Sequence, residues 1–422
     1  MPGLLCRGRC PRRRDAVSIP GTMSSMTTTF ADLTTIGVGG PISSFIEPAD
    51  DDELIDSIRR ADGGRIPLAV IGGGSNILVA DEPFDGVVLR DARRGVSIVD
   101  GGSTGSGGNR VRIKAQAGCV WDDLVDATVS RGWHGIEGLS GIPGTVGASV
   151  VQNIGAYGQE VATSVRSVRV WDRAALVVRD IEASRMGFGY RTSMLKHSMY
   201  QAPGVPDRRF FPTPRFVVLA VEFELFRTGY ATVGYGQLAK ALGVEVGAEM
   251  EPARVRTAVL SIRGAKGMLE DARRYDLAAM RDMRAQSGLA AALSHQKGLD
   301  EESLADRHSC GSFFVNPVLP LRRGATLPPE APRFEAVLPD GSPGVKTSAA
   351  WLIEHSGFAR GFRVTPQARA SLSTRHTLAL TNRGGATAED VAVLARTVAA
   401  GVLSTFKVDL MPEPVIVGVD VP

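Results

Sequence analysis

The sequence has little of what marks several large protein classes. It holds four cysteines among 422 residues, Cys6, Cys10, Cys119 and Cys310, which are too few and too scattered for a disulfide framework. Cys6 and Cys10 lie four residues apart, but no second Cys/His pair follows at the spacing of a zinc site. We therefore interpret the cysteines as free thiols in a reducing compartment and expect no bound metal.

Long apolar runs and a strong charge imbalance are also missing. No run of 18 apolar residues occurs, so we expect no membrane span. The net charge is only +3 and no basic stripe stands out, which makes nucleic acid a poor candidate partner. Apolar residues make up 43% and charged residues 22%, as in ordinary globular proteins, and the length suggests two or three domains.

The N-terminus lacks the apolar core of a secretory signal, although it carries five arginines within its first 14 residues. We interpret residues 1–27 as a disordered arm and expect a cytoplasmic protein. Met23 and Met26 are alternative starts to Met1, just before the first ordered-looking segment.

Two common phosphate-binding motifs are absent. No G-x-G-x-x-G follows the first strand, and no G-x-x-x-x-G-K-[ST] occurs anywhere. Glycine is nevertheless abundant in three segments, 37–40, 72–76 and 138–158. Glycine permits positive φ and lets backbone N–H groups approach a ligand, so consecutive free amides form an anion site. The three segments therefore favour a bound diphosphate, although each could also be a set of tight turns.

The apolar periodicity indicates a mixed chain. It predicts helices over 52–61 and 121–131, and a helix behind Thr387 with Val391, Leu394, Val398 and Val402 on one face. The stretch 250–310 reads as helical, with a solvated helix between Ala272 and Arg284. Residues 101–108 read as a hairpin loop. The predicted strands are 68–71, 87–89, 111–117, 165–171, 175–180, 216–226 (central, because both faces are apolar), Val408/Leu410 and 415–417.

Six segments together resemble the UDP-N-acetylenolpyruvoylglucosamine reductase (MurB) family, in the family's order from about residue 30 to 420. They are Thr35-Ile-Gly-Val-Gly-Gly40, Ile71-Gly-Gly-Gly-Ser-Asn-Ile77, Gly141-Ile-Pro-Gly-Thr-Val-Gly-Ala148 with Gln152-Asn-Ile-Gly-Ala-Tyr-Gly158, Gly189-Tyr-Arg191, Gly311-Ser-Phe-Phe-Val-Asn-Pro317 and Pro412-Glu-Pro414.

The resemblance implies an α+β fold, with a vanillyl-alcohol-oxidase-type (PCMH-like) FAD-binding domain in two subdomains and a C-terminal α+β substrate domain. We expect subdomains at 28–98 and 99–245, the substrate domain at 246–410, and a C-terminal segment, 411–422, that returns to the active site. Three departures stand out: Cys310 replaces the usual alanine, and inserts occur near 199–214 and 270–305.

The resemblance further implies NADPH-dependent reduction of UDP-N-acetyl-3-O-(1-carboxyvinyl)-glucosamine to UDP-N-acetylmuramate through FAD, by a monomer engaged in peptidoglycan synthesis. Alternatives are a flavin oxidase of the same fold with another substrate, and a non-catalytic flavin-binding module.

Site residues follow from the same match. Arg191 would grip the substrate carboxylate, Ser312 would protonate the carbanion, and Glu413, if protonated, would donate to the enolate oxygen. Substrate contacts are expected from Tyr190, Tyr235, Arg263, Lys266 and Asn316, and Lys346, Arg375 and His376 also match family positions. The expected FAD contacts are Gly37, Gly39, Gly72, Gly73, Gly74, Ser75, Asn76, Ser140, Gly141, Gly144, Thr145, Gly147, Asn153, Gly155 and Tyr157.

Overall fold

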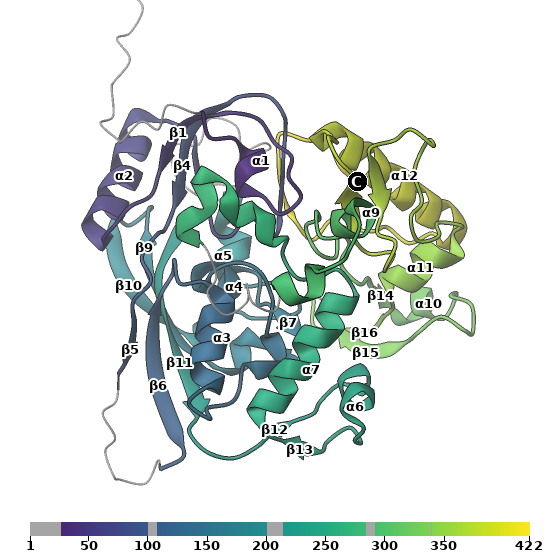
Figure 1. The fold of residues 1–422 in the computed structure, drawn as a ribbon, viewed down its shortest axis with the longest axis horizontal. Helices are drawn as coiled ribbons and strands as arrows, with labels where there is room; N and C mark the ends of the chain where they lie inside the picture. The colour runs from purple at the N-terminus through teal and green to yellow at the C-terminus, as the bar shows by residue number, and fades with distance from the viewer. Residues whose placement is uncertain (1–26, 100–107, 201–213, 284–291, 339) are drawn as a thin grey trace, which may run out of the picture.

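The structure, a computed structural model, describes residues 27–99, 108–200, 214–283, 292–338 and 340–422. Figure 1 shows the first half of the chain, purple to blue, on one side of the molecule and the yellow C-terminal elements on the other. Four predicted features lie wholly or partly outside the described residues: the arm (1–26), the hairpin loop (101–107) and parts of both inserts (201–213 and 284–291).

The first part of the chain folds around a parallel three-stranded sheet in the order β1-β4-β2. Helix α2 begins where the Asp50 side chain accepts from the Glu53 amide, and it buries Leu54 and Ile58 against the sheet. The helix and both strands predicted here are confirmed. The bounds are α1 Phe30–Leu33, β1 Ile42–Ile46, α2 Asp51–Gly64, β2 Leu68–Ile71, β3 Ile77–Val79 and β4 Phe84–Arg90.

An antiparallel five-stranded sheet follows, in the order β10-β9-β11-β6-β5. Strand β11 lies in the middle, as its two apolar faces predicted, and α3 and α4 share the core of this sheet. Trp171, Val217 and Leu219 pack on the other side against the core of α2, so the two sheets share one interior. The bounds are β5 Val96–Ile98, β6 Arg110–Gln116, α3 Trp121–Val129, α4 Val146–Val151, β9 Val165–Asp172, β10 Val177–Glu182 and β11 Phe216–Phe226.

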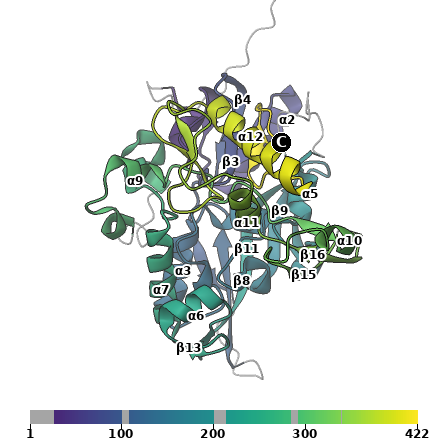
Figure 2. The same ribbon diagram turned by 90° about the vertical axis from the view of Figure 1, so that its right-hand side faces the viewer.

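A further core lies between two C-terminal helices, a two-stranded sheet and the buried pair Phe313 and Phe314, and Leu78 of β3 also contributes to it. Helix α12 begins with a capping box between Thr387 and Asp390, as predicted, and crosses the face shown in Figure 2. The bounds are α7 Pro252–Ala265, α9 Glu301–Ala305, β14 Val318–Pro320, α10 Leu321–Gly324, β15 Phe334–Val337, β16 Pro343–Lys346, α11 Ala349–His355, β17 Ala370–Leu372, β18 Leu380–Asn382 and α12 Ala388–Phe406.

Smaller elements complete the described chain. They are β7 Gly155–Ala156, β8 Gln159–Glu160, α5 Met194–His197, β12 Ala231–Thr232, α6 Gly236–Leu242 and β13 Glu249–Met250, with 3-10 turns at Glu137–Leu139, Val161–Thr163, Ala183–Arg185, Ser198–Tyr200, Ala272–Asp276 and Ala278–Met283.

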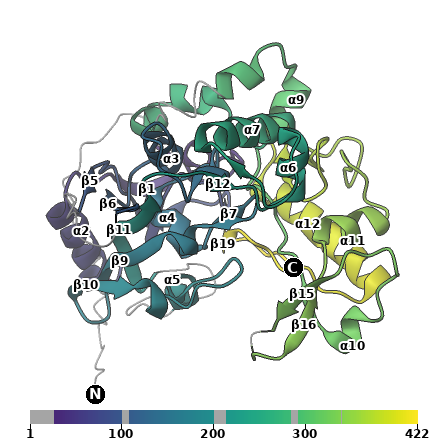
Figure 3. The same cartoon turned by 90° about the horizontal axis from the view of Figure 1, so that it is seen from below.

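The C-terminal strand returns to the first part of the chain. Strand β19, Val415–Val417, pairs in parallel with β3, and its ends are fixed by bonds from Val415 N to Asn76 O and from Ala80 N to Val417 O. Figure 3 shows this yellow ribbon leaving the C-terminal half to reach the other side. The pairing places the residues just before Val415 beside the glycine segment that precedes β3.

Two secondary-structure predictions are wrong. The segment after Ala272 is not a solvated helix but two 3-10 turns, with Arg274, Tyr275 and Met280 buried. Burial is tolerated because Arg274 donates to backbone carbonyls and Tyr275 to Glu270. Val408 and Leu410 do alternate with exposed neighbours, but they form no strand, since none of the strands in the described residues pairs with them.

No helix within the described ranges is both long and apolar enough to cross a bilayer.

The C-terminal core generates a stability prediction. Leu394 on α12 is fully buried, so Leu394→Ala should lower the free energy of unfolding by about 2–5 kcal/mol in denaturant titrations. Leu403 lies on the same helix but is 42% exposed, and Leu403→Ala should change stability by less than about 0.5 kcal/mol. Equal effects of the two substitutions would show that α12 does not pack as described.

Candidate active site

A cavity of about 480 Å³ lies where the two sheets, the C-terminal part and strand β19 meet. Its walls come from residues far apart in sequence, including Gly72 to Ile77, Thr145 to Tyr157, Arg191, Ser309 to Ser312 and Glu413. The three residues predicted to be catalytic, Arg191, Ser312 and Glu413, thus share one cavity.

The glycine segment after β2 is built for a phosphate. In the described chain, the backbone N–H groups of Gly73, Gly74 and Ser75 donate to no protein acceptor. A Cβ on Gly73 would lie 2.7 Å from the Cα of Gly144, so the two glycine segments touch only because both lack side chains. Free, adjacent amides in a concave wall suit an anionic diphosphate, and these residues therefore fit FAD.

The predicted FAD residues divide into two groups. One group lines the cavity: Gly72, Gly73, Gly74, Ser75, Asn76, Thr145, Gly147, Gly155 and Tyr157. The other group does not line it and supports the wall from behind: Gly37, Gly39, Ser140, Gly141, Gly144 and Asn153.

The supporting roles have specific contacts. A Cβ on Gly39 would lie 2.6 Å from that of Phe30. The Ser140 hydroxyl donates to the Glu137 carbonyl at 2.6 Å, and the Asn153 amide donates to Glu160 and to the Gly189 carbonyl. Sequence spacing alone does not separate a glycine that faces a ligand from one that a neighbouring side chain crowds.

Arg191 sits in a tight turn with φ of 54°, a conformation that is uncommon for a residue with a Cβ. Its Nη2 donates to the Gly155 carbonyl at 2.7 Å, and its Nε lies 3.1 Å from Oε1 of Glu413. The guanidinium is thereby held between a glycine segment and the C-terminal acid.

Ser312 and Glu413 come from adjacent extended segments. Glu413 N donates to the Phe313 carbonyl at 2.8 Å, and Phe314 bridges Pro412, so the buried phenylalanines anchor both segments. Burial raises the pKa of Glu413, against the opposing effect of Arg191. Burial therefore favours the neutral form of this carboxyl group.

The predicted substrate residues also divide. Tyr235, Arg263 and Lys266 line the cavity, whereas Tyr190 and Asn316 do not. Asn316 Nδ2 donates to the Tyr190 hydroxyl at 3.2 Å. The guanidinium of Arg191 lies over the Tyr190 ring, with Cζ 5.5 Å from the ring centroid.

Two lysines and a histidine that match family positions lie in or beside the site. Lys266 donates to Gln237 at 2.7 Å, and burial lowers its pKa. Lys346 lies 4.8 Å from the centroid of the Tyr190 ring. His376 also lines the cavity, and burial, with Lys266 nearby, lowers its pKa to about 4, so that it is neutral at pH 7.

Sequence reasoning missed three residues at this site. Gln152 donates to Glu413, Lys196 donates to Gln152, and Arg274 donates to the carbonyl of Gly73 at 3.0 Å. Two features of the sequence could have indicated them: Gln152 begins the glycine-containing motif 152–158, and Lys196 follows Arg191 by five residues. Arg274 lies in the 270–305 insert, and nothing in its pattern set it apart from solvated arginines.

The cysteine that replaces alanine before the Gly-Ser-Phe-Phe motif is buried. The Cys310 thiol donates to the Ile77 carbonyl at 3.2 Å, and burial raises its pKa to about 12. It therefore lines the cavity as a thiol rather than as a nucleophilic thiolate.

Comparisons with known proteins show what this chain is similar to. A family model described as "UDP-N-acetylenolpyruvoylglucosamine reductase, C-terminal domain" matches residues 302–417, and one described as "FAD binding domain" matches residues 42–180. Curated relatives named UDP-N-acetylenolpyruvoylglucosamine reductase include those of Thermobifida fusca (41% identical, 93% of this chain and 99% of the relative) and Nocardia farcinica (41%, 96% and 93%). The relative from Mycobacterium ulcerans is 40% identical, over 96% of this chain and 99% of its own length.

A solved structure shares the fold. The crystal structure of MurB from Thermus caldophilus matches with a TM-score of 0.52 and 23% identity, over 93% of this chain and 98% of that chain. With the FAD-binding match, it confirms the predicted fold class.

The insert generates a prediction about FAD. The planar trans peptide points the Gly73 carbonyl and the Gly74 N–H in opposite directions, so the bond from Arg274 orients that amide. Arg274→Met should raise the dissociation constant of FAD about tenfold, measured by flavin fluorescence on the apoprotein.

The neighbouring Arg273 is a matched control, because its side chain is 48% exposed and pairs with Asp271 and Glu301. Arg273→Met should leave FAD affinity unchanged. An unchanged affinity in Arg274→Met, with the protein folded, would refute the role of the insert.

Proposed function

Because the chain belongs to the UDP-N-acetylenolpyruvoylglucosamine reductase family, we propose that it reduces UDP-N-acetyl-3-O-(1-carboxyvinyl)-glucosamine to UDP-N-acetylmuramate in peptidoglycan synthesis. FAD and NADPH are its cofactors. The observation that carries the proposal is the gathering of Arg191, Ser312 and Glu413 around one cavity beside the amide-rich glycine wall.

FAD, which the glycine segment from Gly72 to Asn76 would hold, would supply the hydride chemistry between NADPH and the terminal carbon of the enolpyruvyl group. The protein must then bind a carboxylate whose negative charge grows as the double bond is reduced. Arg191 is suited to this, because a guanidinium grips a carboxylate with two N–H groups and stays charged. Its Gly155 contact holds the side chain in place before substrate arrives, which limits the reorganisation that the reaction requires.

Glu413 complements Arg191 as a neutral acid. A protonated carboxyl group donates a hydrogen bond to the developing enolate oxygen, whereas an ionised one would repel it. The burial that raises the pKa of Glu413 supports the protonated form.

Ser312 is the proposed proton donor to the carbon adjacent to the carboxylate. Serine is a weak acid, but the carbanion is a strong base, so the transfer is favourable when the hydroxyl is correctly placed. The backbone of the next residue supports that placement, because Phe313 N donates to Leu378 O and Phe313 O accepts from Glu413 N.

The nucleotide-sugar is proposed to reach the cavity mouth along Tyr235, Arg263 and Lys266. Lys266 is the cation available to its diphosphate, while Arg263 already donates to the carbonyls of Gly141 and Met268. We propose that residues 28–98 and 99–245 hold FAD, that residues 246–410 hold the substrate, and that residues 411–422 complete the active site. We also propose a cytoplasmic monomer that serves cell shape, cell division and the cell cycle.

Ser312→Ala tests the proton donor. The variant should keep its yellow flavin and its reduction by NADPH, but reoxidation of the flavin by the enolpyruvyl sugar should slow by about 10²–10⁴-fold. Anaerobic stopped-flow absorbance separates the two half-reactions, with Ser404→Ala, on the exposed end of α12, as control. Complete loss of flavin, or unchanged reoxidation, would remove Ser312 from the proposed role.

Arg191→Ala tests the carboxylate contact. We expect kcat/KM for the sugar to fall by about three orders of magnitude, with a smaller change in FAD affinity, because the lost interaction is strongest in the transition state. The exposed Arg185 provides the control Arg185→Ala, in which steady-state kinetics should not change. Normal turnover in Arg191→Ala would contradict the assignment.

A further inference from the structure

A chain of polar side chains stands behind Glu413. Gln152, the residue that ends α4, donates from Nε2 to Oε1 of Glu413 at 2.8 Å. The Oε1 of Gln152 accepts from Asn76 at 2.8 Å and from Nζ of Lys196 at 3.1 Å. These contacts link the glycine wall, helix α5 and the C-terminal acid.

Lys196 uses every donor that it has. Its Nζ donates to Gln152 Oε1 and, at 3.4 Å each, to the backbone carbonyls of Arg191 and Glu413. An ammonium group has three N–H donors and no acceptor, so it can face only the oxygen of the Gln152 amide. The flipped amide, with Nε2 against Lys196, is therefore excluded, and Nε2 must face Glu413.

The two oxygens of Glu413 are thereby made unequal. Oε1 accepts from Gln152 Nε2 and also from Arg191 Nε at 3.1 Å. Both partners are donors only, so a proton on Oε1 would face two N–H groups. The proton of a neutral Glu413 must then reside on Oε2, the oxygen that neither group holds.

We propose that Lys196 and Gln152 are positioning residues for the reduction: Lys196 orients the Gln152 amide, and this amide keeps Oε1 of Glu413 as an acceptor and leaves the proton on Oε2. The inference rests on the proposed function, because it concerns the acid that the reaction requires. Neither residue donates a proton to substrate, and each acts through Glu413.

The arrangement also determines how Glu413 responds to pH. Burial raises the pKa of Glu413, whereas Arg191, Gln152 and Lys196 each lower it. Partial burial of Lys196 lowers its own pKa, and a further titratable neighbour of Glu413 is Tyr190, whose pKa burial raises. Removal of the Gln152 donor or of the Lys196 charge must therefore raise the pKa of Glu413 further, and the protonated acid must persist to higher pH.

The test uses the FAD-loaded protein with Lys196→Met and Gln152→Met. The anaerobic rate of flavin reoxidation by the enolpyruvyl sugar is measured across pH, and flavin reduction by NADPH is measured separately. We expect reoxidation to slow roughly 10–100-fold while reduction changes little, and the fall in rate at high pH to move upward by about one pH unit.

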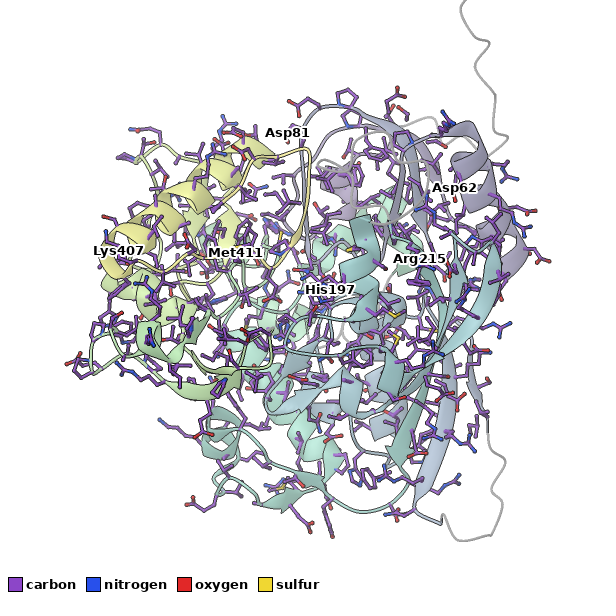
Figure 4. All side chains as sticks on the ribbon, turned by 180° about the vertical axis from the view of Figure 1, so that it is seen from behind. Asp62, Asp81, His197, Arg215, Lys407 and Met411 are labelled. Carbon is purple, nitrogen blue, oxygen red and sulfur yellow. The ribbon has the colours of Figure 1, made fainter. Side chains whose placement is uncertain are left out.

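Matched variants separate positioning from general damage. The control Lys407→Met changes a lysine at the C-terminal end of α12, far from the site. Figure 4 shows Lys407 at the edge of the molecule and His197, the neighbour of Lys196, near its centre. Lys407→Met should leave unchanged both the rate of flavin reoxidation and the pH at which this rate falls. Lys196→Arg keeps the positive charge and the N–H donors. In this variant the pH at which reoxidation falls should lie closer to the wild-type value, and this comparison remains possible even if Lys196→Met folds poorly.

A readout that needs no turnover gives a second measurement. The infrared C=O band of the carboxyl group, assigned by its loss in Glu413→Gln, should titrate at higher pH in Lys196→Met and Gln152→Met than in the wild type. In the double variant, the pH at which reoxidation falls should move by less than the sum of the two single shifts, because Lys196 acts partly through Gln152.

The outcomes distinguish the two proposals. If wild-type reduced flavin is not reoxidised by the sugar, the proposed function fails, while the infrared titration still tests the positioning role. If the pH at which reoxidation falls and the infrared band stay in place in both folded single variants, the positioning role is wrong. Full additivity in the double variant would overturn the link from Lys196 to Gln152.

Discussion

The site depends on one backbone pairing, between β19 and β3. Strand β3 follows directly after the glycine segment that forms the cavity wall, so a strand that pairs beside it brings its preceding residues to that wall. The bond from Val415 N to Asn76 O fixes the register of the pair. A shift by one residue would turn Glu413 away from Gln152 and Arg191. The chain's last strand therefore joins two hydrophobic cores beside the cavity, because Ile416 packs against one core and Val417 lies in the other.

Charge balance is the second constraint on the site. The half-buried side chains of Glu413, Lys196 and Arg191 lie within a few ångströms of one another, and burial disfavours the charged forms of Glu413 and Lys196. The structure offsets that cost with hydrogen bonds rather than with counter-charges alone: Lys196 donates to three oxygens, and Nη2 of Arg191 donates to the carbonyl of Gly155. The same bonds that make burial tolerable hold the groups in the orientation that chemistry at the substrate carboxylate requires.

Much of this could be predicted from the sequence, for physical reasons. Strand β11 has two apolar faces and α12 has a capping box with regular apolar spacing, so local pattern and final structure agree. The pattern failed where burial depended on distant partners. The sequence around Arg274 predicts a solvated side chain, but the fold brings the carbonyls of Leu33 and Gly73 to it. Val408 alternates with exposed neighbours like a strand residue, although no strand that the structure describes pairs with it. The three proposed catalytic residues were predicted through motif resemblance, whereas Gln152 and Lys196 became visible only through their hydrogen bonds.

The central claim is that a glycine wall holds the flavin's diphosphate while Arg191 and Glu413 meet the substrate's carboxylate from the same cavity. A crystal structure of the FAD-loaded protein with the enolpyruvyl UDP-sugar measures this most directly. The account predicts the diphosphate against the amides of Gly73 to Ser75, and the carboxylate within hydrogen-bond distance of both Arg191 and Glu413, with the Ser312 hydroxyl beside the adjacent carbon. A carboxylate bound away from Arg191 and Glu413, or a diphosphate away from that wall, would contradict it.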